Sequence, residues 1–435
     1  MRLADLEATR PPSPSLLHPL GQNESAWAPL SLSSCGDATP AHYAPCLAQR
    51  LKNVVHAEEL LYPDFELREP HFAREEHRRR WRAFVQSDPD FGDRAVFNKG
   101  WVKYRGQSGQ NFVFRDVSYS TGSFGADSWA GTSCMSPYVS TSPIQPLTDS
   151  DEAAAALPTV YIALSPDAYS FQHFLDRVTH IIAQGAHLAA GAAGSAYVLT
   201  GREGTRAVQE MYARMGFPPE RVLHLKPKVA AKEMIFSCRA VLIHPWLSLK
   251  TLELLGVRHK PVSVTRNKTV QVVYMSRSDG HTANPGRKVV NEEAVLHGIR
   301  SLLAERNRGE ELVVFNPDDF RTVTELFAWF AESAIAIIGP HGGAMINHRW
   351  ANPDILVIEF MPTTRIAVMI YEEASLLSQT YAALVVEPTV QGGLDMEIDV
   401  EDVRGLMRAH LGVVGSSPLR KSYPWQAKEL GFRKR

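Results

Sequence analysis

The sequence predicts an α/β protein with two Rossmann-like lobes, and three observations lead to this fold class. A chain of 435 residues exceeds what one hydrophobic core usually supports. From Thr159 onward, short apolar strands alternate with helices whose apolar residues recur every three or four positions. A polar bridge, Gly256–Thr269, divides this alternation into two series. Two such lobes in tandem face a central cleft.

Composition limits the possible partners. The chain has 46 Lys and Arg residues against 47 Asp and Glu residues, and the formal net charge is -1. This balance gives no long-range attraction for a polyanion, so we expect no nucleic-acid partner. No apolar run reaches the length of a membrane span, and membrane contact would therefore need an anchor outside this chain.

The four cysteines are too few for a disulfide scaffold and lack the short paired spacings of a zinc site. We therefore expect no metal site. Cys35 and Cys46 flank a loop and pair if the compartment is oxidising, but two buried free thiols fit the sequence almost as well. The sequence leaves both possibilities open.

The N-terminal third has little periodicity. Residues 1–45 are rich in Pro, Ser, Gly and Ala, which predicts a disordered leader. The segment that follows is an irregular entry region with a strand at Asn111–Val117, and Ser118–Ser150 is expected to be a long loop. We assign the N-terminal lobe to residues 46–265, the C-terminal lobe to 266–395 and a C-terminal tail to 396–435.

The N-terminal lobe contains the first regular alternation. Its expected strands are Thr159–Leu164, Ala196–Leu199, Arg221–Leu225 and Met234–Ile243, and its helices are Ser170–Gln184, Thr205–Met215 and Trp246–Leu255.

The helix Ser170–Gln184 has an apolar stripe, and His173, Asp176 and His180 fall on the opposite face. A histidine with a carboxylate one turn away could act as a general base, because the carboxylate would stabilise the protonated imidazole. A solvated polar face explains the spacing equally well.

The C-terminal lobe alternates more strictly. Its expected strands are Gln271–Ser276, Glu311–Phe315, Ala334–Ile338 and Ile355–Phe360, and its helices are Asn291–Leu303, Thr322–Ser333 and Ala344–Trp350. Short and almost wholly apolar strands indicate a parallel sheet covered on both faces. In such a sheet a ligand sits beyond the carboxyl ends of the strands, so the residues just after each strand are candidates for a binding site.

The loop from Gly339 to Ala344 is the strongest of these candidates. Its glycines permit close backbone approach, and the first turn of the following helix offers N–H groups to a phosphate. His341 lies within this exposed turn, where an imidazole has little structural role. A tight strand-to-helix turn without a ligand is the alternative.

Charged residues lie after the neighbouring strands. Arg277 could neutralise a diphosphate without a metal, because guanidinium forms a bidentate fork to phosphate oxygens. Arg287 follows it, and Asn291 is expected to cap the next helix. Glu359 could accept hydrogen bonds from two ribose hydroxyls. The sequence has no Asp-x-Asp metal signature and no dinucleotide fingerprint.

Several of these segments, in this order and spacing, resemble glycosyltransferase family 61. The resemblance rests on Val273–Arg277, Arg287–Glu293, Ile338–Asn347 and Ile358-Glu359, and on the His-Phe and Asp of Ser170–Asp176. It covers residues from about 158 to 362. Family members usually have alanine directly after the His-Gly pair, whereas Gly343 intervenes here.

The resemblance implies a GT-B fold and an inverting transfer from a UDP-sugar to a glycan or glycoprotein hydroxyl. It also implies a location in the Golgi or endoplasmic reticulum lumen. We expect no cofactor, and His173 or Asp176 as the base. The donor-binding residues are expected to be Ser276, Arg277, Arg287, Gly339, His341, Gly342, Gly343, Ala344 and Glu359.

Two other functions remain open from the sequence. A catalytically silent GT-B-like protein would bind a glycan or nucleotide without turnover. A Rossmann oxidoreductase is disfavoured by the missing dinucleotide fingerprint.

Overall fold

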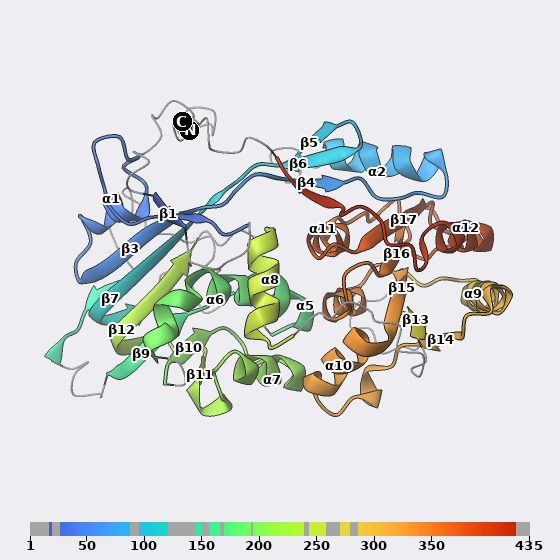
Figure 1. Ribbon diagram of the computed structural model, residues 1–435. Coiled ribbons are helices and arrows are strands. Elements are labelled where there is room, and N and C mark those ends of the chain that lie inside the picture. The colour runs from blue at the N-terminus through green and yellow to red at the C-terminus, as the bar shows by residue number, and fades with distance from the viewer. Residues whose placement is uncertain are drawn as a thin grey trace. The chain divides into compact units, whose positions relative to one another are not determined.

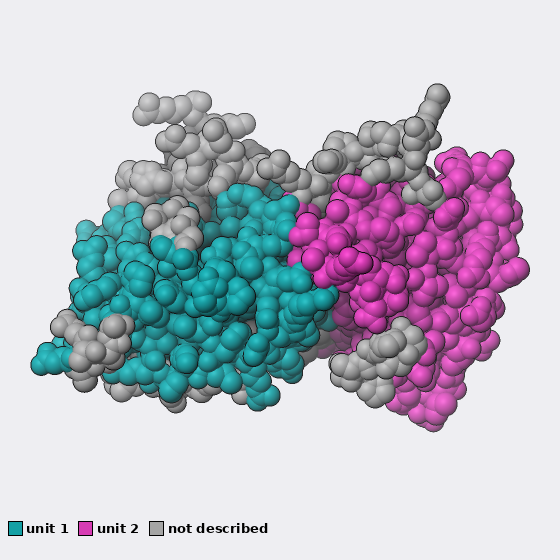
Figure 2. Space-filling view, turned by 90° about the horizontal axis from the view of Figure 1, so that it is seen from below, with its two compact units in different colours: residues 1–64, 106–256, 421–435 teal, residues 65–105, 257–420 magenta. Residues whose placement is uncertain are grey.

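A computed structural model of the chain describes residues 17–19, 27–87, 95–120, 144–149, 156–165, 169–192, 195–238, 243–257, 270–278 and 286–422 (Figure 1). The chain divides into two compact units, coloured separately in Figure 2. Unit 1 comprises Met1–Asp64, Gly106–Gly256 and Lys421–Arg435, and unit 2 comprises Phe65–Arg105 and Val257–Arg420. The fold is mixed α/β and contains several sheets, one of which is parallel throughout.

Unit 1 is built on one large mixed sheet, which has nine strands among the described residues. Its strands are β1 (Leu17–Pro19), β2 (Leu30–Leu32), β3 (Val54–Leu61), β7 (Ser108–Ser120), β8 (Ile144–Pro146), β9 (Leu157–Ile162), β10 (Tyr197–Thr200), β11 (Val222–His224) and β12 (Lys228–Cys238). The spatial order is β1-β2-β3-β7-β12-β9-β10-β11, with β8 paired to β7. Pairing is antiparallel from β1 to β12 and parallel from β12 to β11.

Most helices of unit 1 are connected to the parallel half of this sheet, whereas α1 lies between the antiparallel strands β2 and β3. They are α1 (Ala44–Ala48), α5 (Phe171–His173), η4 (Phe174–Val178), α6 (Thr179–Gly185), η5 (Ala186–Ala192), α7 (Arg206–Arg214), η6 (Pro219–Arg221) and α8 (Pro245–Leu254). The expected α/β alternation is therefore present from β9 to β11. The region expected to be an irregular entry instead forms the antiparallel half of the sheet.

Unit 2 contains a parallel sheet, with five strands in the described part of the chain and order β14-β13-β15-β16-β17. The strands are β13 (Val270–Tyr274), β14 (Glu310–Val314), β15 (Ala334–Pro340), β16 (Leu356–Pro362) and β17 (Thr380–Val386). The helices are α9 (Glu292–Arg306), η7 (Pro317–Asp319), α10 (Val323–Ser333), η8 (Gly343–Trp350), α11 (Met369–Leu376) and α12 (Val400–His410). The expected strands and helices of the C-terminal lobe are thus present, with boundaries shifted by a few residues.

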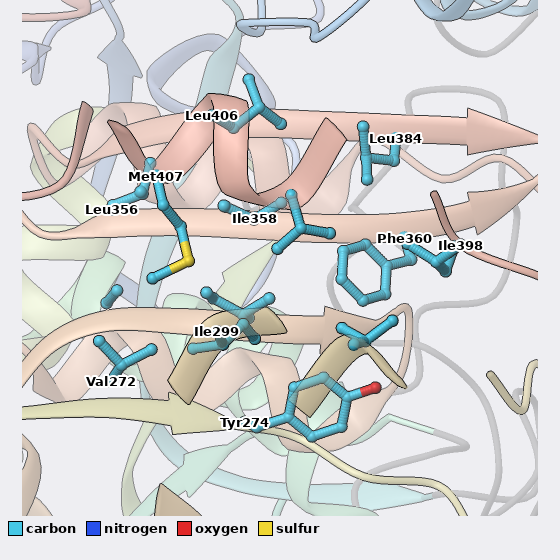
Figure 3. Close-up of a cluster of buried hydrophobic side chains, with 14 of the residues drawn as sticks. Val272, Tyr274, Ile299, Leu356, Ile358, Phe360, Leu384, Ile398, Leu406 and Met407 are labelled. Carbon is cyan, nitrogen blue, oxygen red and sulfur yellow. The ribbon is translucent and has the colours of Figure 1, made fainter. Parts of the chain in front are cut away.

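The core of unit 2 explains why this sheet forms. Helices α9 and α12 pack on each other and cover alternate strand residues such as Val272, Ile358 and Phe360, which Figure 3 labels. The intervening residues of the strands, such as Ile337 and Val357, are buried as well. A sheet that is buried on both faces needs nearly continuous apolar strands, which is the pattern in the sequence.

A second, smaller sheet in unit 2 differs from the expected lobe boundaries. Its strands are β4 (Phe65–Arg68), β5 (Ala95–Asn98), β6 (Trp101–Tyr104) and β18 (Leu419–Lys421), in the order β18-β4-β6-β5, and helix α2 (Glu75–Ser87) accompanies it. Residues 65–105, expected in the N-terminal lobe, therefore belong to unit 2. The reason is a set of long-range contacts: Trp81 packs edge-on against Tyr371, and His77 binds Asp402.

The two terminal segments also differ from expectation. Residues 27–45, expected in a disordered leader, are described and include β2 and the start of α1. Residues 396–420, expected to be a tail, include α12, whose side chains contribute to the core of unit 2.

Cys35 and Cys46 form a disulfide, which resolves the alternative that the sequence left open. Disulfides persist in oxidising compartments, so this bond indicates a protein of the secretory pathway. Among the helices of the described ranges, none has both the length and the hydropathy of a membrane span.

Candidate anion and sugar-transfer site

The strand order of unit 2 fixes where a ligand would bind. In the sheet, β13 lies between β14 and β15. The chain adds β14 on one side of β13 and then β15 on the other, so the strand order reverses at the β13–β15 pair. In open α/β sheets, ligands bind outside the carboxyl ends of the strands at such a switch point. Ser276-Arg277 follows β13, and the loop from His341 to Gly343 lies at the end of β15.

Arg277 and the glycine loop are in direct contact. Arg277 is only 7% exposed, and its Nε donates to the carbonyl of Gly286 at 3.1 Å. A Cβ atom on Gly342 would lie 2.4 Å from Nη1 of Arg277. The guanidinium therefore lies against the backbone at Gly342, and a side chain there would displace it. The structure thus brings together two candidates that are far apart in sequence.

Arg287 adds a second buried guanidinium. It is 4% exposed, and its Nε has no hydrogen-bond partner among the described residues. Burial, together with the charges of Arg277 and Arg365, lowers the pKa of Arg287 to about 10, although Glu359 opposes this shift. Like charges held together in this way are destabilising until an anion neutralises them.

Arg365 is the residue that the sequence analysis missed. It is exposed in the turn after β16, and its backbone N–H donates to the carbonyl of Pro362. Its position just beyond the carboxyl end of the parallel strand β16 could have predicted it as a site residue. The sequence analysis assigned only Glu359, within the same strand.

His341 is held by a buried carboxylate. Its Nδ1 lies 2.6 Å from Oε1 of Glu359, and the hydroxyl of Tyr381 donates to Oε2 of the same carboxylate. Since the carboxylate accepts, the geometry assigns the proton of this bond to Nδ1, leaving Nε2 as the other polar atom of the ring. Burial, followed by the negative charge of Glu359, raises the pKa of Tyr381, so the tyrosine stays a donor.

Glu359 has partners within unit 2 that the sequence did not indicate. The residue is 0% exposed, and both its oxygens already accept hydrogen bonds from side chains of the same unit. Its side chain has no exposed surface at which a ribose hydroxyl could bind in this conformation. Its place in the structure is that of a group that orients His341.

The remaining candidates surround the loop. Ser276 donates from Oγ to Glu292 at 2.9 Å, which ties it to the start of α9. A Cβ on Gly339 would lie 2.6 Å from the carbonyl oxygen of Met275, so the two strands approach closely there. Gly343 begins η8, a 3₁₀ helix rather than the expected α-helix, and Ala344 is exposed in its first turn.

Asn291 does not cap α9 with its side chain. Its amide instead donates to the carbonyl of Ile398 and accepts from the N–H of the same residue. It is a structural residue, as expected, but through a different contact.

His173 and Asp176 lie in unit 1, at the start of the helical run that follows β9. The hydroxyl of Ser170 accepts from the backbone N–H of His173, which caps the run. Nδ1 of His173 lies 3.4 Å from Oδ2 of Asp176. Neither this Nδ1 nor Oδ1 of Asp176 has a hydrogen-bond partner among the described residues. The pair predicted from the helical spacing is thus present.

His180 does not share their face. It is 0% exposed, because it lies in α6, all of whose residues from Thr179 to Gly185 are buried. The preceding residues, Phe174–Val178, form a π-helical turn. π-helical turns occur often at functional sites, which is consistent with the position of His173 and Asp176.

The fold of unit 2 is that of an open parallel α/β sheet, a class of proteins in which ligands bind at the switch point, where two buried arginines lie here. Residues 171–358 match the family model of Glycosyltransferase 61. The chain therefore carries a glycosyltransferase 61 domain, which extends from the helix of His173 and Asp176 to β16. This domain implies a transferase with a sugar donor and an acceptor, and it confirms the family that the sequence motifs indicated. No curated protein matches the chain.

Proposed function

We propose that this protein is an inverting glycosyltransferase of the GT-B type that transfers GlcNAc, xylose or arabinose from a UDP-sugar to a hydroxyl of a glycan or glycoprotein. The observation that carries the proposal is the guanidinium of Arg277 against the Gly342 backbone, beside the buried Arg287. This arrangement presents two guanidinium groups to an anion, and the diphosphate of a UDP-sugar is such an anion.

The donor would be bound entirely by unit 2. Arg277 and Arg287 hold the diphosphate, and the N–H groups of Gly342, Gly343 and Ala344 complete the anion site. His341 donates or accepts at Nε2, in an orientation set by Glu359. Arg365 supplies a further positive charge at the exposed side.

Acceptor activation is assigned to unit 1. The acceptor oxygen attacks the anomeric carbon as the bond from this carbon to the UDP oxygen breaks, and the acceptor proton passes to His173 or Asp176. One direct displacement inverts the anomeric configuration. The departing UDP gains negative charge, which the fixed arginines stabilise without reorganising.

A divalent metal can stabilise the negative charge of a departing diphosphate, and Arg277 and Arg287 would do so here. We therefore propose that the reaction needs no metal. Activity should survive EDTA. A complete loss that manganese restores would contradict this part of the proposal.

We also propose that the enzyme works in the lumen of the Golgi or endoplasmic reticulum. The Cys35–Cys46 disulfide and the family resemblance support this location.

The test is a thermal-shift screen with UDP-GlcNAc, UDP-xylose, UDP-arabinofuranose and UDP, followed by hydrolysis and transfer assays with each ligand that binds. A ligand that binds only the folded state raises the melting temperature. We expect UDP and at least one UDP-sugar to do so, and that sugar to be hydrolysed slowly without acceptor. Binding of UDP without any turnover would indicate a catalytically silent protein, and no binding would contradict the donor site.

A further inference from the structure

Unit 2 contains a cavity of about 160 Å³ away from the switch point. It is lined by residues of β4, β17, the end of α12 and the loop before β18, among them Arg68, His71, His410 and Ser416. A cavity needs only about 10–15 Å³ to hold one water, so this one admits a larger group. Thr380 and Tyr381, at the amino end of β17, also line it, whereas the donor loop lies at the carboxyl ends of the strands.

The charges around the cavity are predominantly positive. Arg68 donates from Nη2 to the hydroxyl of Ser416 at 2.7 Å. Glu69 is the one carboxylate among the described lining residues, and both its oxygens accept from Arg82, at 2.7 and 2.6 Å. This bidentate pair neutralises Glu69, which leaves Arg68 as the net charge of the lining.

Two imidazole rings complete the lining. The ring centroids of His71 and His410 are 4.1 Å apart. Burial first, and then the nearby charges of His410, Arg68 and Arg78, lowers the pKa of His71 to about 4. Burial also lowers the pKa of His410. The rings are therefore neutral at pH 7, and an anion placed between them and Arg68 would favour their protonation.

We propose that this cavity is a binding site for a tetrahedral oxyanion, a phosphate or sulfate group, held by Arg68, His71, His410 and the hydroxyl of Ser416. The group is either a free ion or the anionic substituent of a sugar, since both present the same oxygens. Binding couples to proton uptake by the two imidazoles, so the affinity rises as the pH falls from 7 toward 5. This site does not depend on the proposed transfer reaction.

The test uses the full chain with ¹³C-labelled histidine and follows the ring signals of His71 and His410 by NMR. The signals are assigned with His71→Gln and His410→Gln. The ligands are inorganic phosphate, inorganic sulfate and glucose 6-phosphate. We expect saturable shifts of both signals at millimolar ligand, with tighter binding at pH 5.5 than at pH 7. Tighter binding of glucose 6-phosphate than of phosphate would assign the natural ligand to the sugar-borne group, and the reverse would assign it to the free ion.

Four variants make the test specific. Arg68→Gln should weaken binding about tenfold or more, because a charge-assisted contact is lost. Arg68→Lys should retain most of the affinity, because it keeps the positive charge. If Arg68→Gln fails to fold, His410→Gln takes its place, and it should also weaken binding. Arg321→Gln, a change at an exposed arginine before α10, should leave the titration unchanged. Arg277→Gln should also leave it unchanged, which separates this cavity from the donor site.

Two results would overturn the proposal. One is the absence of any shift of the two signals at tens of millimolar phosphate and sulfate at pH 5.5. The other is equal affinity in the wild type and in Arg68→Gln, or in His410→Gln if the glutamine variant at position 68 does not fold.

Discussion

Arg277 is the residue whose removal tests the donor site most directly. Its guanidinium is buried against Gly342, where it would contact the donor diphosphate. Arg277→Ala should lower kcat/KM roughly thirty- to thousand-fold, because a charge-assisted phosphate contact disappears. This factor corresponds to a loss of about 2–4 kcal/mol in transition-state stabilisation. Steady-state kinetics over a range of donor concentrations measures this loss, and Arg321→Ala serves as the control arginine. Activity near that of the wild type at low donor concentration would show that the donor binds elsewhere.

Gly342 tests the same contact from the other side. Its φ of 172° is extended backbone that any residue adopts, so alanine introduces no backbone strain. The new Cβ would instead displace Nη1 of Arg277, which is the end of a flexible side chain. We therefore expect Gly342→Ala to raise the KM for the donor with little change in melting temperature.

The control for Gly342 is Gly405→Ala, at a helical glycine of α12 with open space around its Cβ position. This change should leave the kinetics intact and raise stability by up to about 1 kcal/mol, because alanine is the better helix former. An unchanged KM in Gly342→Ala would mean that the position of Arg277 does not govern donor binding.

At the scale of the element, α8 depends on a neutral histidine at its start. His244 accepts from the N–H of Trp246 at Nδ1 and donates from Nε2 to the carbonyl of Pro63. Burial lowers its pKa to about 3. The unfolded chain binds the proton more readily than the folded one, so this histidine destabilises the fold as the pH falls below about 6.5.

We expect the titration of His244 to lower the free energy of unfolding by about 2 kcal/mol between pH 8 and pH 5. Urea unfolding at both values measures it in the wild type and in His244→Asn, which keeps a side-chain cap but does not titrate. Between pH 8 and pH 5, the free energy of unfolding of His244→Asn should fall by about 2 kcal/mol less than that of the wild type. Equal losses in the two proteins would show that His244 is not the group that titrates.

The helical run after β9 carries the other prediction for an element. His173→Ala and Asp176→Asn should lower turnover by about two orders of magnitude or more if one of them is the base, and UDP affinity should not change. Stability should change by no more than about 1 kcal/mol, because both side chains lie outside the apolar stripe. Turnover, UDP affinity and melting temperature are measured together. If turnover and melting temperature fell together in these variants, this face of the helix would have a structural role. Full activity in both variants would mean that another residue is the base.

For the whole molecule, the disulfide supports the first strands of unit 1. It joins residues 11 positions apart, and closing a loop of that length restricts the unfolded chain by about 3 kcal/mol in the chain-entropy account. The Cys35→Ser/Cys46→Ala double variant should be less stable by up to this amount, as measured by urea unfolding. The single variant Cys35→Ser keeps the buried Cys46 side chain, so it separates the loss of the bond from the change in packing. If the free energy of unfolding differed from that of the wild type by less than about 0.5 kcal/mol, the bond would contribute little to stability.

Much of unit 2 and most of its site could be predicted from the sequence, because both depend on local order. The strands before Ser276 and Gly339 are apolar and short, and in a parallel sheet their carboxyl ends must meet at one edge. Arg277, His341 and Gly342 therefore converge, as their positions indicated. Glu359 was placed at the right strand, but its contacts with His341 and Tyr381 were not predicted, since nothing local marks either residue as its donor.

The α/β class, the succession of strands along the chain and the family could be predicted from the amino-acid sequence, since periodicity and motif spacing are local properties. Three features required the folded structure: residues 65–105 join unit 2, the helix that contains His180 is buried on all sides, and Glu359 orients His341. Each of these depends on contacts between distant segments, such as Trp81 with Tyr371, and the burial of such surfaces outweighs local preference. The Cys35–Cys46 bond belongs with them, because pairing requires the folded chain to bring the two thiols together.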